Sequence, residues 1–403
     1  MRLIYNSIIL FLFINIQVFS QNIQSPSEHL GYEIGTQFSR HSQVIDYFDY
    51  VSNELPDNMK MEKYGETYER RPLYLAYISS KENIKNIDLI RKNNLSNTGI
   101  IKKEINSSID KDIAIVWLSY NVHGNESSST EASMKTLYLL LTKNSNLLDN
   151  TIVIIDPCVN PDGRDRYANW YNQTVTIPYN TNSKSREHDE PWPGGRANHY
   201  LYDLNRDWAW ITQTESKSRL KIYNKWLPHV HVDYHEQGID NPYYFAPAVE
   251  PYHEIITKWQ RDFQKEIGKN NAKYFDKNGW LYFTKETFDL LYPSYGDTYP
   301  TYLGAIGMTY EKAGGGVAGL GILNSENKVL TLVDRVNHHT TTGISTVEIS
   351  SINAKKLNDE FKLFFNNSSE VKNYILRGEK DKIDTLKELL DQHEIIYSSG
   401  KSN

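Results

Sequence analysis

Four short segments of the chain are apolar or alternate between apolar and polar residues, and turn-forming residues bound each of them. Such runs predict buried or half-buried β-strands. Helical spacing of apolar residues predicts a helix near the N-terminus and three more between the strands. Strands that alternate with helices indicate an α/β fold with a mostly parallel or mixed sheet covered on both faces. The predicted strands are 113–120, 151–160, 229–236 and 304–311, and the predicted helices are 42–55, 129–143, 214–227 and 251–268.

Three further segments complete the predicted organisation. Residues 59–80 read as two strands around a turn at Gly65. Residues 171–201 lack periodicity, and because loops of that length are usually functional, we expect a wall or lid of a cleft. Residues 371–399 predict strand, helix and strand, with one apolar helical face formed by Ile383, Leu386, Leu389 and Leu390. We expect a main domain over 21–365 and an extension over 366–403, which either docks on it or begins a second domain.

The first 20 residues combine one Arg, a short apolar run and a small residue at the end. This pattern is typical of a secretory signal peptide, and the apolar run is short for a membrane span. We therefore expect cleavage after Ser20 and a secreted or periplasmic protein without a membrane span in its mature form. Cleavage removes Arg2 and no acidic residue, so the net charge changes from −6 to −7. This balance argues against nucleic acid as the main partner.

The chain has a single cysteine, Cys158, which excludes an intrachain disulfide. Its apolar surroundings predict a small buried side chain, and no His lies in a motif that would make it a nucleophile. The fold must therefore depend on its hydrophobic core for stability.

Polar residues that could bind a metal or take part in catalysis lie at the carboxyl end of each of the four central strands. In open α/β sheets the ligand site lies outside the carboxyl ends of the strands. These residues are therefore expected to share one crevice: His123 and Glu126, Asn160 and Asp162, His235, and Glu311.

A His and a Glu three residues apart at a strand end, as in HGNE (123–126), can converge on one cation, although the pair alone is a weak signal. The strand over 229–236 alternates, so His229, His231, Asp233 and His235 lie on one face. Only His235 lies where this strand runs out into the crevice, which makes it the expected third ligand. His229 and His231 are expected to be packing residues deeper in the sheet.

Two imidazoles and one carboxylate leave a position open on zinc, which is the arrangement of a hydrolytic site. Zinc activates a bound water, and a carboxylate is then needed to take the proton of that water. Glu311, at the end of its strand, is the expected general base. The alternative is an ordinary exposed Glu beside Lys312.

Five motifs, in order and in approximate spacing, resemble those of the M14 family of zinc carboxypeptidases: HGNE (123–126), NPDG (160–163), DLNR (203–206), DYHEQG (233–238) and TYE (309–311). The resemblance covers about residues 40–350. It implies an α/β fold with a central mixed, largely parallel eight-stranded sheet and one catalytic Zn²⁺.

Carried over residue by residue, the resemblance implies that His123, Glu126 and His235 bind the metal and that Glu311 is the general base. Asp203 is similar to the family carboxylate that orients the first His, a partner that fixes the tautomer of a ligand imidazole. Asn205 and Arg206 match the pair that binds the terminal carboxylate of the substrate, a task for which a guanidinium is suited. NPDG is read as a structural turn instead of a catalytic motif.

The sequence departs from the family pattern at two positions. The family has an Arg that polarises the scissile carbonyl about a dozen residues beyond NPDG, whereas residues 167–185 contain none. Arg166 is the preferred substitute over Arg164, and a surface Arg166 paired with Asp165 is the alternative. The family also has a Tyr that closes over the substrate. Tyr292 fits its spacing best among four tyrosines, the others being Tyr295, Tyr299 and Tyr302. Asp297 either attracts a basic substrate side chain or caps a turn.

The preferred hypothesis is a secreted zinc carboxypeptidase that acts on peptides with a free C-terminus. Arg206 is its discriminating feature, because it suits a free terminal carboxylate. The first alternative is a zinc amidase for cell-wall peptides or other acyl-amino acids. The second is a non-catalytic zinc-containing binding module, against which the presence of all three ligands and Glu311 argues. The sequence does not predict an oligomeric state.

Overall fold

The computed structural model describes residues 23–101, 111–366 and 373–400. Its main sheet comprises β1 (Met59–Glu66), β2 (Pro72–Ile78), β3 (Ala114–Tyr120), β4 (Thr151–Asp156), β5 (Val230–Gln237), β6 (Tyr243–Tyr244), β8 (Tyr282–Phe283) and β10 (Ile306–Ala313). Two small sheets pair β7 (Val249–Tyr252) with β9 (Asp289–Leu290), and β11 (Gly321–Leu323) with β12 (Val329–Thr331).

The helices are α1 (Pro26–Leu30), α2 (His41–Glu54), α3 (Lys81–Lys85), α4 (Ile87–Asn97), α5 (Ser128–Thr142), α6 (Pro161–Thr174), α7 (Thr214–Trp226), α8 (Lys258–Asn278), α9 (Tyr299–Tyr302), α10 (Leu332–Ile352), α11 (Ala354–Asn366) and α12 (Lys380–Gln392). Three short 3-10 turns lie at Ser145–Asp149, Arg186–His188 and Leu204–Arg206.

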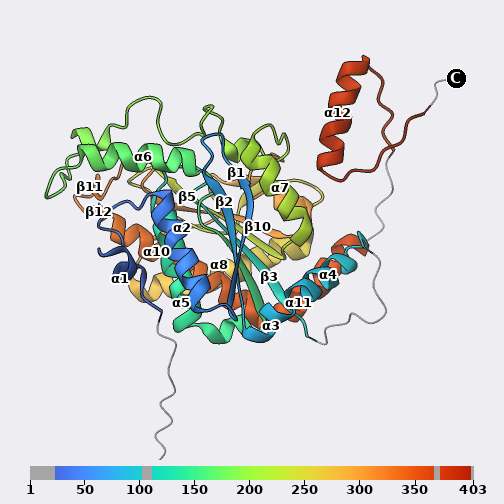
Figure 1. Cartoon of the computed structure of the whole chain (residues 1–403), viewed down its shortest axis with the longest axis horizontal. Helices are drawn as coiled ribbons and strands as arrows, with labels where there is room; N and C mark the ends of the chain where they lie inside the picture. The colour runs from blue at the N-terminus through green and yellow to red at the C-terminus, as the bar shows by residue number, and fades with distance from the viewer. Residues whose placement is uncertain (1–22, 102–110, 367–372, 401–403) are drawn as a thin grey trace, which may run out of the picture.

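The main sheet has eight strands in the order β1-β2-β4-β3-β5-β10-β6-β8. Figure 1 shows its strands β1, β2 and β3 with the helices around them. The central strands β4, β3, β5 and β10 run parallel to one another. The pairs β1/β2, β2/β4 and β10/β6 are antiparallel. This mixed sheet with helices on both faces confirms the expected fold class, and the four central strands are the four apolar segments of the sequence.

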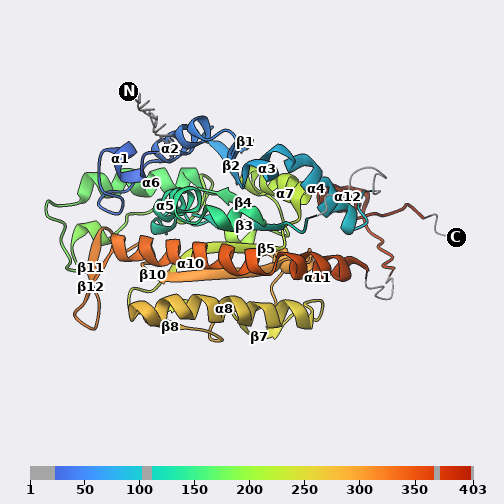
Figure 2. The ribbon, with the colours of Figure 1, turned by 90° about the horizontal axis from the view of Figure 1, so that it is seen from below.

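The alternation of side chains along the central strands divides the core into two layers. On one face, Val116 and Leu118 of β3 belong to a cluster that includes side chains of α2, α5, α8 and α10. On the other face, Ile115 and Trp117 belong to a cluster with α4 and α7. Figure 2 shows α8 and α10 side by side on one side of the sheet. Both faces of the parallel strands are therefore buried, which explains their nearly continuous apolar sequences.

Two predicted boundaries were wrong. The chain reverses between β1 and β2 at Thr67–Arg71, with Arg70 at a positive φ, and Gly65 lies inside β1 at a shift in the pairing register. The predicted helix over 251–268 begins later, because Thr257 caps α8 together with Gln260 and the preceding residues pair as β7. The end of β1 and the start of α8 are therefore determined by polar turn and cap residues and not by the spacing of apolar residues.

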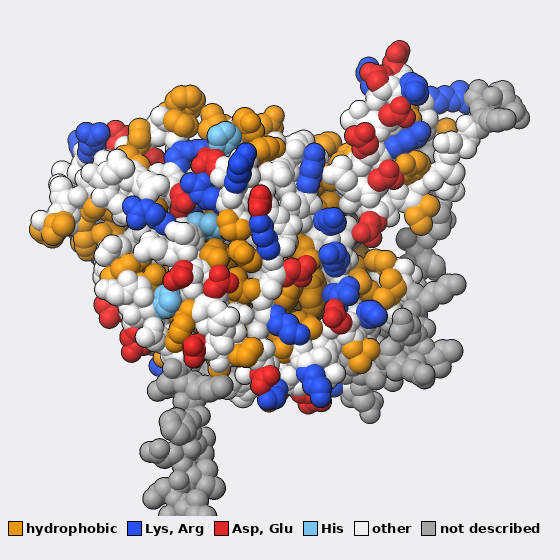
Figure 3. Space-filling model, viewed as in Figure 1, with side chains coloured by type: hydrophobic (Ala, Val, Ile, Leu, Met, Phe, Trp, Pro, Cys, Tyr) orange, Lys and Arg blue, Asp and Glu red, His pale blue; other side chains and the backbone are white. Residues whose placement is uncertain are grey.

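The C-terminal segment forms the predicted helix, α12, but not the predicted flanking strands in its described part. Residues 373–379 and 395–400 have no strand partner among the described residues, so their backbones form no ladder. The helix lies at the margin of the molecule, where it carries acidic and basic side chains (Figure 3). Its contact with the main domain includes Leu389, which packs against the cluster on the α7 side, and His393, which follows the helix and hydrogen-bonds Tyr299 and the Ala209 carbonyl.

Cys158 is a buried free thiol whose Sγ donates to Asn121 Oδ1 over 3.3 Å, as expected for a packing residue. In the described part of the chain, no helix combines the length and apolar character that crossing a membrane requires. The predicted signal peptide, residues 1–20, lies outside the described residues.

Candidate active site

The turn after β3 sets the direction of its polar side chains. Asn121 adopts a positive φ of 61°, and its Nδ2 donates to the carbonyls of His123, Gly124 and Glu126 over 2.9 to 3.2 Å. Gly124 packs against the start of α6 so closely that a Cβ there would lie 2.2 Å from the carbonyl carbon of Gly163. The turn therefore has one compact shape, which directs His123 and Glu126 to the same point.

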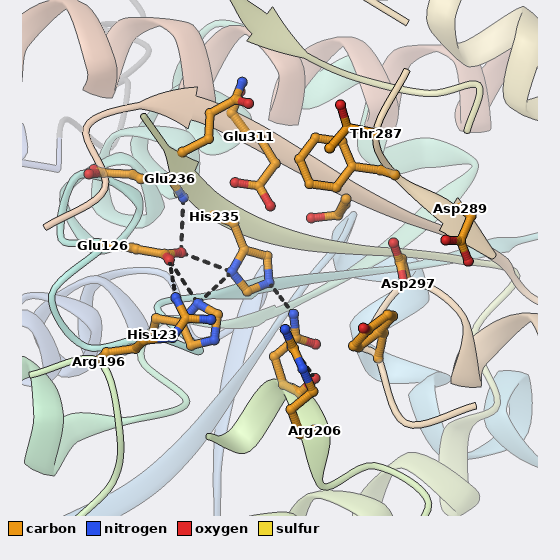
Figure 4. A pocket seen from close by; sticks show the side chains of 15 residues that line it. His123, Glu126, Arg196, Arg206, His235, Glu236, Thr287, Asp289, Asp297 and Glu311 are labelled. Carbon is orange, nitrogen blue, oxygen red and sulfur yellow. Dashed lines mark hydrogen bonds and ion pairs between the residues drawn. The ribbon is translucent and has the colours of Figure 1, made fainter. Parts of the chain in front are cut away.

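His235, near the end of β5, completes a group of three possible ligands whose donor atoms all lie within 4.8 Å of one another. The Nδ1 atom of His123 lies 2.8 Å from Glu126 Oε1, and the Nδ1 atom of His235 lies 2.9 Å from Glu126 Oε2. The two imidazole Nδ1 atoms are 3.2 Å apart (Figure 4). Zinc–ligand bonds of about 2.0–2.2 Å place the ligands of a tetrahedral site about 3.3 Å apart. The three buried side chains thus fit one zinc ion in both chemistry and spacing.

Asp203 lies behind the first His, as the sequence predicts. Its Oδ1 atom is 2.9 Å from His123 Nε2, which leaves His123 Nδ1 to face the other two ligands. Burial raises the pKa of Asp203, but the hydrogen bond to His123 and the nearby positive charges outweigh burial and hold the pKa below its usual value. The same balance holds the pKa of Glu126 well below its usual value, because His123 and His235 outweigh the effect of its burial. Both carboxylates are therefore ionised at neutral pH.

Glu311 is placed by the pairing of β10 with β5, where Glu311 stands opposite His235 in the parallel register. Its carboxylate points into the pocket (Figure 4). Burial raises the pKa of Glu311 well above its usual value, and the negative charges of Glu126 and Asp297 raise it further. A carboxyl with this tendency to hold a proton suits a group that accepts one from water and later donates it.

The three possible ligands and Glu311 line a pocket of about 360 Å³ at the carboxyl ends of β3, β5 and β10. Asn205 and Arg206 line it too, from the 3-10 turn that follows Asp203. Asn205 Oδ1 accepts from Gly296 N over 2.8 Å. The guanidinium of Arg206 lies over the Tyr295 ring at 4.5 Å, with close to half of its side chain exposed. Both residues are thus in position to bind a ligand group that enters the pocket.

The structure does not bring Arg166 to this pocket. Its guanidinium donates to the Gly194 carbonyl over 3.0 Å and lies 4.0 Å from Glu69, and Asp165 pairs with Arg71 instead. The helix α6 begins at NPDG, so Arg166 projects from its first turns toward the loop at Gly194 and not toward the strand ends. Arg164 is buried in an ion pair with Glu131.

Arg196 lines the pocket instead, and sequence reasoning missed it. Its Nη1 lies 3.1 Å from Glu126 Oε1 and its Nη2 lies 3.0 Å from Asp203 Oδ2. It comes from the unpatterned segment 171–201, so this segment contributes a wall of the pocket. The available sequence signal was the turn PWPGG directly before Arg196, seven residues ahead of Asp203.

The other predicted positions separate into two groups. Tyr295 and Asp297 line the pocket, whereas Tyr292 lies outside the pocket lining. Its ring is tilted by 59° against that of Tyr295, with 4.9 Å between the ring centroids, and its hydroxyl accepts from Trp210 Nε1. Asn160 caps α6, and Asp162 binds Arg71, so NPDG is a structural turn that does not share the crevice.

His229 and His231 are buried packing residues, as predicted. His229 Nδ1 accepts from the backbone N–H of Ile115. His231 Nε2 lies 2.8 Å from Asp233 Oδ1 and its ring packs among aromatic side chains.

The fold and the site together define an α/β metallohydrolase, with three ligands and a carboxylic acid at the ends of adjacent strands. The family model of zinc carboxypeptidases matches residues 44–274, more than half of the chain. The chain therefore belongs to the zinc carboxypeptidase family. The match contains the three ligands and Arg196 and ends before Glu311, which the structure adds to the site.

Solved structures of metallocarboxypeptidases share the fold. Thrombin activatable fibrinolysis inhibitor is 16% identical, over 83% of this chain and 79% of its own, with a TM-score of 0.54. Carboxypeptidase A of Helicoverpa armigera is 14% identical, over 85% and 76% of the two chains, with a TM-score of 0.52. A metallo-carboxypeptidase of Burkholderia cenocepacia is 14% identical, over 79% and 70%, with a TM-score of 0.52. No curated protein sequence matches the chain.

Proposed function

We propose that the protein is a secreted or periplasmic carboxypeptidase that uses one Zn²⁺ to hydrolyse the C-terminal peptide bond of peptides. The observation that carries this proposal is the convergence of His123, Glu126, His235 and Glu311 in a pocket that also holds Arg206. Membership of the zinc carboxypeptidase family supports the reaction. The signal peptide predicted over residues 1–20 supports the location, and the mature protein has no membrane span and no nucleic-acid partner in this proposal.

Each residue has a role that follows from its place. His123, Glu126 and His235 would hold the zinc, which when bound would supply an activated water and polarise the scissile carbonyl. Glu311 takes a proton from the water as the water oxygen bonds to the carbonyl carbon. It then delivers a proton to the amine nitrogen as the carbon–nitrogen bond breaks. Asp203 holds His123 in the tautomer that leaves Nδ1 free for the metal.

Two arginines interact with the two negative charges of the reacting substrate, the oxyanion that develops on the carbonyl and the terminal carboxylate. Arg196, beside Glu126 and Asp203, donates to the carbonyl oxygen as negative charge develops on it. Arg206 lies 4.0 Å from the nearest carboxylate oxygen, that of Asp203, so its guanidinium is available for the terminal carboxylate, which Asn205 also contacts. Tyr295, which lies under Arg206 and lines the pocket, replaces Tyr292 as the residue that contacts the bound substrate.

An amidase for acyl-amino acids would use the same ligands and the same Arg206, since its substrates also end in a free carboxylate. The two activities are separated by the acyl group that the protein accepts. The binding-module alternative predicts no turnover even though Glu311 is in place.

The test measures release of the terminal amino acid from N-blocked dipeptides, from their C-terminal amides and from simple N-acyl amino acids by the zinc-loaded protein. We expect release from the free-acid dipeptides, at least 100-fold slower release from the amides, and none with Glu311→Gln. Arg206→Met should remove the preference for the free acids, whereas Arg166→Met should keep it. A protein that binds one zinc and releases nothing contradicts the proposal, and turnover of N-acyl amino acids alone supports the amidase.

A further inference from the structure

One carboxylate beside the metal group has an oxygen without a partner. Asp233 lies between His231 and His235 on one face of β5, and only 1% of its side chain is exposed. Its Oδ1 is 2.8 Å from His231 Nε2, whereas Oδ2 has no hydrogen-bond partner in the described part of the chain. The nearest imidazole nitrogen to Oδ2 on the other side is His235 Nε2, at 4.0 Å. A buried carboxylate oxygen without a hydrogen-bond donor costs free energy, so a donor that reaches Oδ2 would stabilise the protein.

The surroundings of Oδ2 limit which donor can reach it. The backbone of Gly296 closes over this oxygen, because a Cβ at Gly296 would lie 1.6 Å from Oδ2. The same Cβ would lie 2.8 Å from Trp208 Nε1, an N–H that also lacks a partner among the described residues. Solvent is therefore kept away from Oδ2, and the Trp208 indole and the His235 imidazole are two donors near it. The guanidinium of Arg219, which lies over the Trp208 ring at 4.0 Å, also stabilises the negative charge of Asp233.

The hydrogen bonds of Asn205 show which tautomer His235 adopts in this structure. Gly296 N donates to Asn205 Oδ1, and this contact directs the Nδ2 group of Asn205 toward His235 Nε2, 3.3 Å away. His235 Nε2 must then be the acceptor, with the ring proton on Nδ1 beside Glu126 Oε2. A metal bound at Nδ1 would displace that proton, and the neutral ring would then carry its proton on Nε2. His235 Nε2 and Asn205 Nδ2 would then both be donors, so the hydrogen bond between them would be lost.

We propose that Asp233 is the positioning residue of His235: its Oδ2 accepts the Nε2 proton when Nδ1 holds the metal. The amide of Asn205 is thereby released from His235 and can turn to the substrate carboxylate. Asp203 holds His123 in the same way, over 2.9 Å. Each ligand imidazole thus has its own carboxylate, and Asp233, which is far less exposed than Asp203, is the more strongly desolvated of the two. This inference rests on the proposed metal site.

The test compares zinc dissociation constants, measured by competition with a chromophoric chelator, for the wild type, Asp233→Asn, Asp203→Asn and His231→Gln. Outer partners of ligand imidazoles typically contribute a factor of about 10–100 in metal affinity. We expect a loss of about 10- to 100-fold for Asp233→Asn and for Asp203→Asn. His231→Gln removes the other partner of Asp233 and should stay within about threefold of the wild type. The visible absorption bands of the Co²⁺-loaded protein should change with Asp233→Asn and not with His231→Gln.

The outcomes separate this inference from the function on which it rests. A wild type that binds no zinc overturns both. A wild type that binds zinc, with Asp233→Asn equal to it in affinity and in the Co²⁺ spectrum, overturns the role of Asp233 alone. Equal losses of zinc affinity in Asp233→Asn and His231→Gln would assign Asp233 a structural role, and this result would also overturn the inference that Asp233 positions His235. Should Asp233→Asn fail to fold, the wild type decides the question by ¹⁵N-histidine NMR. Zinc must then move the His235 proton to Nε2 and protect it from solvent exchange, and rapid exchange contradicts the inference.

Discussion

Replacing Arg196 by Met should reduce turnover severely and leave the fold nearly unchanged. The side chain is 47% exposed and makes two ion pairs, with Glu126 and Asp203. Glu126 is buried but keeps its contacts with His123 and His235 when Arg196 is lost. Each pair is therefore counted at the value of an exposed pair, about 0.2–1 kcal/mol, and the free energy of unfolding should fall by no more than about 1–2 kcal/mol. Loss of one preorganised donor to a developing oxyanion, by contrast, costs about 10²–10³ in kcat.

The assay measures kcat and KM for a blocked dipeptide at saturating zinc, because Arg196 also contacts the ligand Glu126 and saturation keeps a change in metal affinity out of kcat. Arg166→Met is the matched control, since that arginine lies on α6 outside the pocket lining and binds the Gly194 carbonyl. We expect kcat to fall by about 100-fold or more for Arg196→Met and to change less than about threefold for Arg166→Met. A kcat of Arg196→Met within threefold of the wild type refutes the reasoning, as does an equal loss in the control.

Three further predictions concern other parts of the molecule. Glu311→Gln should retain one zinc, measured by metal analysis, and lose about 10³-fold or more in kcat, because a neutral amide cannot take the proton of the water; a variant that keeps a tenth of the activity contradicts this. Gly124→Ala should lower the free energy of unfolding, measured with denaturant, by about 1–3 kcal/mol or more, because its Cβ would meet the backbone of Gly163 at 2.2 Å; an unchanged free energy contradicts this. Burial raises the pKa of Asp156 to about 7, so the folded state holds this proton more tightly than the unfolded state, and stability present at pH 4 is lost as pH rises to about 7, by about 4 kcal/mol for this group. Burial also raises the pKa of Glu215 and Asp297 to about 7, so unfolding measured between pH 4 and 8 should show a loss in Asp156→Asn that is smaller than in the wild type by about 4 kcal/mol, and an equal loss in both proteins contradicts this.

The metal group could be predicted from the sequence because it depends on local rules. His235 and Glu311 lie at the ends of strands whose alternation and apolar content are visible in the chain, and parallel strands bring their carboxyl ends to one edge. His123 and Glu126 lie in one turn, three residues apart. For such residues, spacing along the chain is sufficient to predict that they come together in the structure.

Arg196 and Tyr295 could not be predicted because tertiary contacts place them. Arg196 comes from a segment without periodicity. Its ion pairs with Glu126 and Asp203, and the hydrogen bonds that its carbonyl accepts from Asn160 Nδ2 and Gly124 N, bring it to the pocket. Tyr295 and Tyr292 lie three residues apart in one loop, and the contact with Arg206 decides which of them lines the pocket.

The elements of the fold that escaped prediction are short or depend on partners. Strands such as β6, β8 and β9 have two residues each, too few to show a period. The segments flanking α12 have strand-like composition, yet a strand also requires a neighbour with which to pair, and composition carries no information about that neighbour.

The most direct test of the central claim follows one peptide of known sequence by mass spectrometry. The peptide is incubated with the zinc-loaded protein, with the chelator-treated protein, and with the treated protein after zinc is restored. The account predicts a mass loss equal to the C-terminal residue in the first and third samples and no change in the second. Cleavage at an internal bond, or equal cleavage in all three samples, would contradict a zinc-dependent carboxypeptidase.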